Sequence, residues 1–226
     1  MQTFRTKLSQ VETALHDGAV YCGHGYESVS DEAVALVLGA AGLSPEQSLS
    51  LLDQPFPAEA ESQLMALLDR RCRQRLPVAY CLREAYLSGL RFIADARALI
   101  PRAPVSPVVA ERLAPWWPED REPSLIVDVC CGGGSLGLIA AAAFPGTPVL
   151  LSDLDEQALS LASENIALHG QSDRVWALRA DLLSAIRSGS ADVVLANPPY
   201  VSRAEMAALP PASCLAPRAA LAATAA

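Results

Sequence analysis

The sequence lacks the excess of positive charge that is typical of proteins that hold nucleic acid through its phosphates. Its 226 residues include 17 Lys and Arg but 25 Asp and Glu, which gives a formal net charge of -8 at pH 7. This composition argues against a protein whose affinity rests on phosphate contacts, although it leaves a local basic patch open.

Long apolar runs are also missing. No uninterrupted apolar stretch approaches the ~20 residues that cross a membrane, and residues 1–18 contain no apolar segment like the centre of an export signal. The six cysteines form no C-x-x-C pair, which argues against a zinc framework and a disulfide scaffold. His24 stands alone between two glycines, so no metal site is predicted. We therefore expect a cytoplasmic protein without a membrane segment.

The N-terminal third of the chain is predicted to be helical. Apolar residues at helical spacing follow Ser30-Asp31 and stop at Gly42, and a second apolar stripe ends at Pro77. We interpret residues 1–76 as a small helical domain. Four arginines crowd the last turns of its second helix, either as a solvated helix end or as a contact for an acidic or RNA-rich partner: Arg70, Arg71, Arg73 and Arg75.

Short segments of alternating polarity come next. Glu84–Leu87 and Leu90–Ile93 flank a two-residue turn, and this pattern predicts a β-hairpin. Prolines then mark a linker, so we interpret residues 77–118 as a hairpin and linker between two domains. Trp116 and Trp117 lie between two prolines and are predicted to anchor the core.

The second half of the chain alternates strands and helices. Strands are predicted at residues 125–129, 149–152, 174–179 and 191–196, and helices at residues 135–144 and 156–168. Such alternation implies parallel strands with helices on the faces of the sheet. The predicted fold class is therefore α/β, with a Rossmann-like domain over residues 119–226.

The first of these strands leads directly into a glycine-rich loop. Three successive glycines, Gly132–Gly134, let the backbone turn tightly and approach a ligand, and the following helix offers unpaired N–H groups. The second strand ends at Asp153, where dinucleotide-binding folds place an acid for the ribose. Another acid, Asp181, follows the third strand. The pattern predicts a nucleoside-containing cofactor.

Two cofactors fit this pattern. A nicotinamide dinucleotide is favoured by the G-x-G-x-x-G spacing of Gly132, Gly134 and Gly137, but it gives no role to Asp128 inside the first strand. S-adenosylmethionine explains more of the pattern, and we favour it. The expected positions are Asp128 near the amino-acid moiety, Gly132, Gly133 and Gly134 beneath the nucleoside, Asp153 on the ribose hydroxyls and Asp181 beside the adenine.

The last predicted strand ends at Asn197-Pro198-Pro199-Tyr200. Each proline lacks a backbone N–H and restricts the residue before it, so Asn197 and Pro198 are held extended with carbonyls free to accept hydrogen bonds. The Asn197 side chain adds an amide oxygen, and Tyr200 can lie against a flat group. An ordinary Asn-Pro turn would have the same sequence. In this context the tetrapeptide is predicted to hold the NH2 group of a planar amide or amine.

The motifs together resemble a known family, the class I methyltransferases that N5-methylate glutamine. Within it they are similar to the branch that modifies the third protein of the large ribosomal subunit. The resemblance runs from about Gly23 to Arg218. Its motifs are GHG at 23–25, DEA at 31–33, RLPVAY at 75–80, IPR at 100–102, APWW at 114–117, the glycine loop, SDL at 152–154, ADLL at 180–183, NPPYV at 197–201 and EMAALP at 205–210.

The resemblance implies roles for particular residues. The cofactor loop of the family falls on Cys130, Cys131 and Gly132–Gly134, where the family has small or threonine-like residues in place of the cysteines. Its ribose acid falls on Asp153, its adenine-side pair on Asp181 and Leu182, and its substrate amide clamp on Asn197, Pro198, Pro199 and Tyr200. The family sheet continues beyond the last strand of this sequence, so an incomplete, C-terminally truncated sheet is expected.

The implied reaction is transfer of a methyl group from S-adenosylmethionine to a glutamine side chain of a large-subunit ribosomal protein. Residues 1–76 would recognise this substrate, and contact with ribosomal RNA during assembly is a further expectation. Two alternatives stay open: an adenine-N6 nucleic-acid methyltransferase with a similar clamp, and a non-catalytic S-adenosylmethionine-binding or ribosome-assembly factor.

Overall fold

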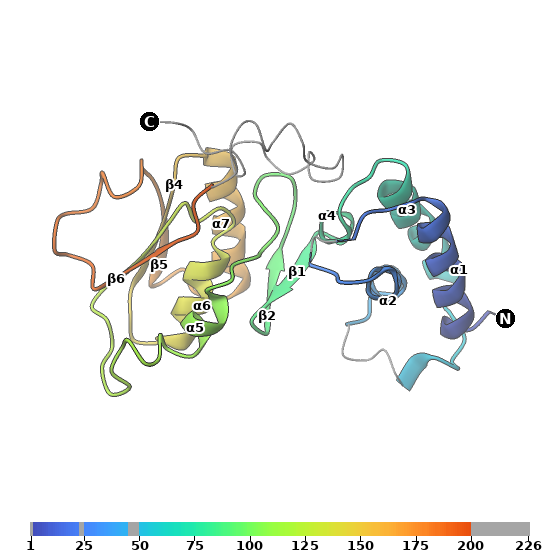
Figure 1. Cartoon of the computed structure of the whole chain (residues 1–226), viewed down its shortest axis with the longest axis horizontal. Helices are drawn as coiled ribbons and strands as arrows, with labels where there is room; N and C mark the ends of the chain where they lie inside the picture. The colour runs from blue at the N-terminus through green and yellow to red at the C-terminus, as the bar shows by residue number, and fades with distance from the viewer. Residues whose placement is uncertain (1, 23–24, 45–49, 200–226) are drawn as a thin grey trace. The chain divides into compact units, whose positions relative to one another are not determined.

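The chain folds as two compact units, one ending at Arg83 and the other starting at Glu84. The structure is a computed structural model that describes residues 2–22, 25–44 and 50–199. The first unit is helical, and the second contains a β-hairpin and a parallel sheet (Figure 1). This confirms the predicted α/β class, while the predicted domain limits at residues 76 and 118 stay predictions. Within the described ranges, no helix is both long enough and apolar enough to cross a membrane.

The helical unit packs its elements around one apolar core. These elements are α1 (Phe4–Asp17), α2 (Val29–Ala40), η2 (Ala58–Ala60), α3 (Glu61–Cys72) and α4 (Val78–Leu82). Leu15 of α1, Leu36 of α2 and Leu67 of α3 are almost fully buried together. Burial of each such side chain stabilises the fold by about 1.5–3 kcal/mol. The apolar stripes predicted from the sequence therefore form one core.

Helix α2 begins earlier than predicted. Ser28 is its N-cap, because its hydroxyl oxygen accepts a hydrogen bond from the Asp31 backbone N–H at 3.1 Å. The Asp31 carboxylate in turn accepts the Ser28 N–H at 3.0 Å, which completes a capping box. The start predicted at Ser30-Asp31 was therefore two residues late, since Asp31 acts from inside the first turn.

The arginines near the end of α3 mostly bind other parts of the helical unit. Arg71 is fully buried and forms an ion pair with Glu32 of α2 at 2.7 Å. Arg70 donates to the Tyr80 and Cys81 carbonyls, and Arg75 donates to the Gly18 carbonyl. The prediction of a solvated helix end is therefore wrong for Arg71, because its charge is buried and paired with Glu32. Its guanidinium ties α3 to α2 through the interior.

The second unit begins with the hairpin and continues into the sheet. Its elements are β1 (Glu84–Leu87), β2 (Leu90–Ile93), α5 (Ser106–Ala110), β3 (Ile126–Val129), α6 (Ser135–Ala143), β4 (Val149–Asp153), α7 (Glu156–Leu168), β5 (Val175–Arg179) and β6 (Val193–Ala196). The hairpin strands match the prediction residue for residue. The four later strands are all parallel and lie in the order β5-β4-β3-β6.

Helices α6 and α7 pack against one face of this sheet (Figure 1). Ile126 of β3, Leu151 of β4 and Leu195 of β6 point toward the helices and join Leu138 and Phe144 in the main core of the unit. The alternation of side chains along a strand explains why every second residue takes part. This layer fixes the positions from which the loops at the strand ends project.

One predicted core anchor was wrong. Trp116 is 76% exposed, whereas Trp117 is partly buried against the core and donates its indole N–H to the Arg121 carbonyl at 2.7 Å. Successive side chains in a turn point in different directions, so the turn that directs Trp117 inward leaves its neighbour in solvent.

Candidate functional site

The strand order creates a switch point between β3 and β6. From β3 the chain moves to β4 and then β5 on one side, whereas β6 pairs with β3 on the other side. Ligands of open α/β sheets bind outside the carboxyl ends of the strands at such a point. The glycine loop follows β3, and Asn197 follows β6. The two motifs singled out in the sequence therefore begin on neighbouring strands at this edge.

The glycine loop has a backbone geometry that side chains would disturb. Gly132 and Gly134 have φ angles of 54° and 79°, in the left-handed region that favours glycine. A Cβ on Gly134 would lie 2.7 Å from Leu151 Cδ1, and a Cβ on Gly137 would lie 2.2 Å from Leu151 Cδ2. The G-x-G-x-x-G spacing therefore serves the tight turn and the close packing of α6 on β4.

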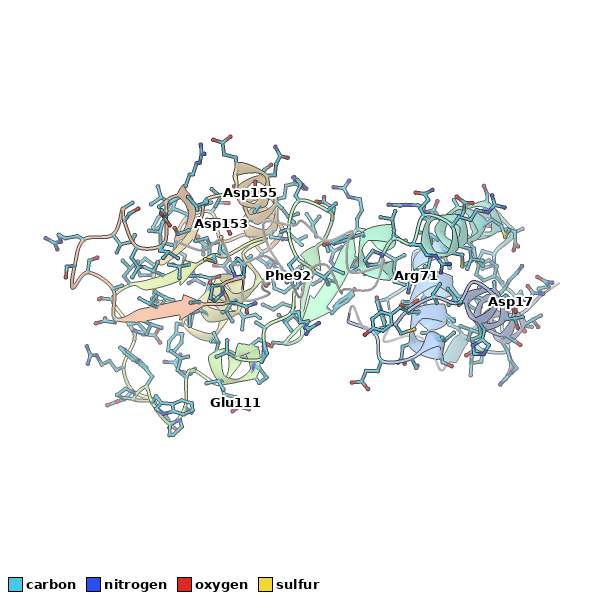
Figure 2. All side chains as sticks on the ribbon, turned by 45° about the horizontal axis from the view of Figure 1, so that its top comes forward. Asp17, Arg71, Phe92, Glu111, Asp153 and Asp155 are labelled. Carbon is cyan, nitrogen blue, oxygen red and sulfur yellow. The ribbon has the colours of Figure 1, made fainter. Side chains whose placement is uncertain are left out.

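Asp153 holds the glycine loop against the end of β4. Its Oδ2 accepts the Gly132 N–H at 2.9 Å, and its Oδ1 accepts the Asp155 N–H at 3.0 Å. Figure 2 shows Asp153 and Asp155 close together at the same edge of the sheet. A carboxylate has about four acceptor positions, so each oxygen keeps capacity for another donor. Asp153 can thus brace the loop and still accept hydroxyl groups from a ligand.

Asp128 lies beneath the loop. It is 1% exposed, and its Oδ2 accepts the Gly137 N–H in the first turn of α6 at 2.8 Å. The pKa of this carboxyl is raised to about 7. Burial is the largest cause and the nearby charge of Asp153 adds to it, while the hydrogen bond from Gly137 acts in the opposite direction. The observed contact of Asp128 supports α6, and its predicted place near an amino-acid moiety stays a prediction.

The raised pKa of Asp128 predicts a pH-dependent stability. The folded protein holds this proton more tightly than the unfolded chain, whose carboxyl titrates near 4. The stabilisation from the protonated form is therefore complete below about pH 4 and is lost as the pH rises through about 7. Asn in place of Asp128 can still accept the Gly137 N–H but does not titrate.

We expect the urea-unfolding free energy of the wild type to fall, relative to Asp128→Asn, between about pH 4 and 7. The difference in slope is at most about 1.4 kcal/mol per pH unit, because one proton is involved. If the unfolding free energies of the two proteins changed with pH in parallel, the raised pKa would not belong to Asp128.

Asp181 and Leu182 lie beyond the end of β5, at the same edge of the sheet. The Ala180 N–H donates to the Asp153 carbonyl at 3.1 Å, which keeps this loop beside β4. Leu182 has a φ of 48°, and its carbonyl accepts the Ser152 hydroxyl at 3.2 Å. Cys130 also has a positive φ, 55°. Leu182 and Cys130 thus share a left-handed backbone conformation in the segments that follow β5 and β3.

Asn197 is oriented by the segment that follows the hairpin. Its Nδ2 donates to the Arg102 carbonyl at 3.1 Å. A carbonyl can only accept, so this contact turns the NH2 end of the side chain toward Arg102 and leaves Oδ1 as an acceptor. Pro198 is exposed and Pro199 partly buried, while Tyr200, which was predicted to complete the clamp, lies outside the described residues.

Sequence reasoning missed Asn165 and Arg97. Asn165 of α7 is 1% exposed and bonds to the glycine loop. Arg97 forms ion pairs with Asp95 and with Glu164 of α7. These contacts raise the pKa of Arg97 above its ordinary value, chiefly because its guanidinium donates hydrogen bonds to the two carboxylates. In the sequence, Asn165 could have been noticed only as a polar residue inside the apolar stripe of α7.

A shallow, open hollow of about 470 Å³ lies between the segment after the hairpin and the start of α7. It is lined by Asp95, Ala96, Arg97, Asp155 and Gln157. One lining residue, Asp155, donates its backbone N–H to Asp153, the carboxylate predicted to bind a ribose. The structure therefore brings the glycine loop, Asp153, Asp181 and Asn197 to one edge of the sheet.

Comparison with known proteins identifies the parts of the chain. Residues 111–210 match a family model described as Methyltransferase small domain, and residues 14–82 match one described as PrmC N-terminal domain. The solved structure of TrmN from Thermus thermophilus is similar at 33% sequence identity, with a TM-score of 0.36, and covers 46% of this chain and 30% of that chain.

Curated relatives match most of the chain. The ribosomal protein uL3 glutamine methyltransferase of Bordetella pertussis is 38% identical over 210 residues, which cover 93% of this chain and 70% of that protein. The protein of the same name from Burkholderia pseudomallei is 33% identical, with coverages of 92% and 70%. That from Francisella tularensis is 31% identical, and the match spans 61% of its length. The resemblance drawn from the motifs is thereby confirmed, and the chain belongs to the family of ribosomal protein uL3 glutamine methyltransferases.

Proposed function

We propose that this protein transfers a methyl group from S-adenosylmethionine to the side-chain amide nitrogen of a glutamine in ribosomal protein uL3. The observation that carries this proposal is the switch point between β3 and β6. A cofactor-type glycine loop leaves one strand there, and a rigid pair of acceptors leaves the neighbouring strand. The relatives at 31–38% identity are named for the same reaction.

The residues at the edge of the sheet fit the cofactor. A Cβ added at Gly132 would be in ordinary contact with Ala98 Cβ, at 3.7 Å, so the positive φ of this residue, and not crowding, is what favours glycine there. Asp153 would accept the ribose hydroxyls, while Asp181 and Leu182 would lie on the adenine side and Cys130–Gly134 beneath the nucleoside. When bound, S-adenosylmethionine supplies an electrophilic methyl group on a sulfonium. Asp128 would act through its support of α6 and the loop.

Asn197 and Pro198 would hold the substrate amide. The Asn197 Oδ1 and the Pro198 carbonyl are acceptors, and they would take the two N–H protons of a glutamine side chain. An amide nitrogen is a weak nucleophile because its lone pair is delocalised, so orientation must supply much of the rate. Alignment of two bound reactants contributes about 7–11 kcal/mol to lowering a barrier. The amide nitrogen would form a bond to the methyl carbon while the carbon–sulfur bond breaks, with the electron pair of that bond staying on sulfur as a thioether. The N–H proton of the methylated nitrogen, now more acidic, would leave to solvent.

Purified uL3 with radiolabelled S-adenosylmethionine tests this function. We expect label in uL3, in a peptide whose mass is increased by one methyl group at a glutamine, and no label in adenine-containing DNA or RNA. Label in nucleic acid would favour the adenine-N6 methyltransferase. Cofactor binding without label in either would favour a non-catalytic binding or assembly role. The Asn197→Ala protein is the matched control for background transfer.

A further inference from the structure

Asn165 occupies a position that the apolar pattern of α7 would give to a hydrophobic side chain. It is 1% exposed and lies one turn from Leu161 and next to Ile166, which are 2% and 5% exposed. A buried amide without partners costs about 1–3 kcal/mol, so its retention there requires hydrogen bonds.

The side chain of Asn165 has three partners from two separate segments. Its Oδ1 accepts the Ile93 N–H at 2.7 Å, and its Nδ2 donates to the Ile93 carbonyl at 3.2 Å. Nδ2 also donates to the Gly133 carbonyl at 2.9 Å. The carboxamide therefore pairs with Ile93 as a neighbouring strand would, and it holds the glycine loop with its second N–H.

We propose that Asn165 is a positioning residue of the cofactor site, because it fixes the peptide of Gly133 by tying it to β2 of the hairpin. This inference rests on the proposed function, in which the loop carries the cofactor. Asp153 already holds the N–H of Gly132, and Asn165 holds the carbonyl of the next residue. Two adjacent residues of the loop are thus held by side chains from β4 and α7.

A loop held in this way loses less conformational freedom when a ligand binds. Glycine has more freedom to lose than any other residue, so a run of three glycines gains most from being held beforehand. Neither leucine nor aspartate can replace the amide. Leucine has the shape but no polar atoms, and aspartate keeps the acceptor for the Ile93 N–H but loses both donors.

The test compares S-adenosylmethionine binding by wild type, Asn165→Leu and Ile166→Ala in titration calorimetry, below the melting temperature of each. Ile166 is the matched control, because it is buried on the same helix and its truncation also destabilises the fold. We expect Asn165→Leu to raise the Kd about tenfold, which corresponds to one hydrogen bond of about 1.4 kcal/mol. Ile166→Ala should leave the Kd unchanged, and the KM for the cofactor should rise in Asn165→Leu with little change in kcat.

The outcomes separate the two proposals. A wild type that does not bind S-adenosylmethionine would contradict the proposed function. A wild type that binds, with Asn165→Leu equally tight, would contradict only the role of Asn165. If Asn165→Leu does not fold, Asn165→Asp is measured in the same way. The wild type supplies an independent check by NMR: the side-chain NH2 resonances of Asn165 should shift on cofactor titration, and their constancy would overturn the inference.

Discussion

Replacing Asn197 by alanine is expected to reduce the rate of methyl transfer to uL3 by roughly a hundredfold, the loss seen when one preorganised polar group of a reacting centre is removed. The change deletes an acceptor that the Arg102 carbonyl holds in a fixed orientation. That acceptor matters most as the amide nitrogen rehybridises, so kcat should fall while the affinity for S-adenosylmethionine stays close to wild type.

Single-turnover transfer of radiolabel, measured beside calorimetric cofactor binding, separates these two quantities. Val194→Ala is the matched control, because this half-exposed residue lies on the same strand and its side chain is not at the carboxyl end. Transfer by Asn197→Ala at the wild-type rate would show that the amide clamp is wrong. A loss of rate with Val194→Ala as well would attribute the effect to β6 as a whole.

Replacing Asp153 by alanine is expected to weaken S-adenosylmethionine binding at least tenfold. Hydrogen bonds to a charged group contribute about 1.5–3 kcal/mol each, and two ribose hydroxyls are predicted to donate to this carboxylate. The structure adds a second cause of weakening. The Gly132 and Asp155 N–H groups lose their acceptor in the same variant, so the loop itself becomes less ordered.

Asp192→Ala provides the control for this measurement. Asp192 also carries a carboxylate that accepts two hydrogen bonds, from the Ser124 N–H and hydroxyl, but it lies before β6, away from the carboxyl edge. We expect this variant to bind S-adenosylmethionine like the wild type. Calorimetry that shows unchanged affinity for Asp153→Ala would remove Asp153 from the cofactor site.

The sequence alone predicts the parts of the site that follow strands. Parallel strands place their carboxyl ends at one edge, so a glycine loop after one strand and an acid after the next must meet there. Asp153 and Gly132 do so, and their contact at 2.9 Å joins residues 21 positions apart. The hairpin could also be predicted from the sequence, because its pattern is local and its turn lies between two short strands.

Residues whose partners are distant in the sequence were not predictable in this way. Arg71 reads as a charged helix end, and only the fold brings it to Glu32, 39 positions away. Asn165 reads as a polar interruption of an apolar stripe, because its partners lie 72 and 32 positions away. In both cases a single side chain binds groups from separate segments. The spacing of residues in its own helix gives no information about those distant partners.

The supports of the glycine loop have a consequence for how substrate specificity can evolve. Asp153 and Asn165, which hold the loop, and Ile93, which holds Asn165, all precede β6 in the chain. The predicted amide clamp begins only after that strand. A change at Asn197, whose side chain bonds Arg102 and none of these groups, can therefore alter which planar nitrogen is accepted while the contacts that hold the loop stay in place. A single methyl-donor module of this kind can be inherited intact by enzymes that differ in the molecule they modify.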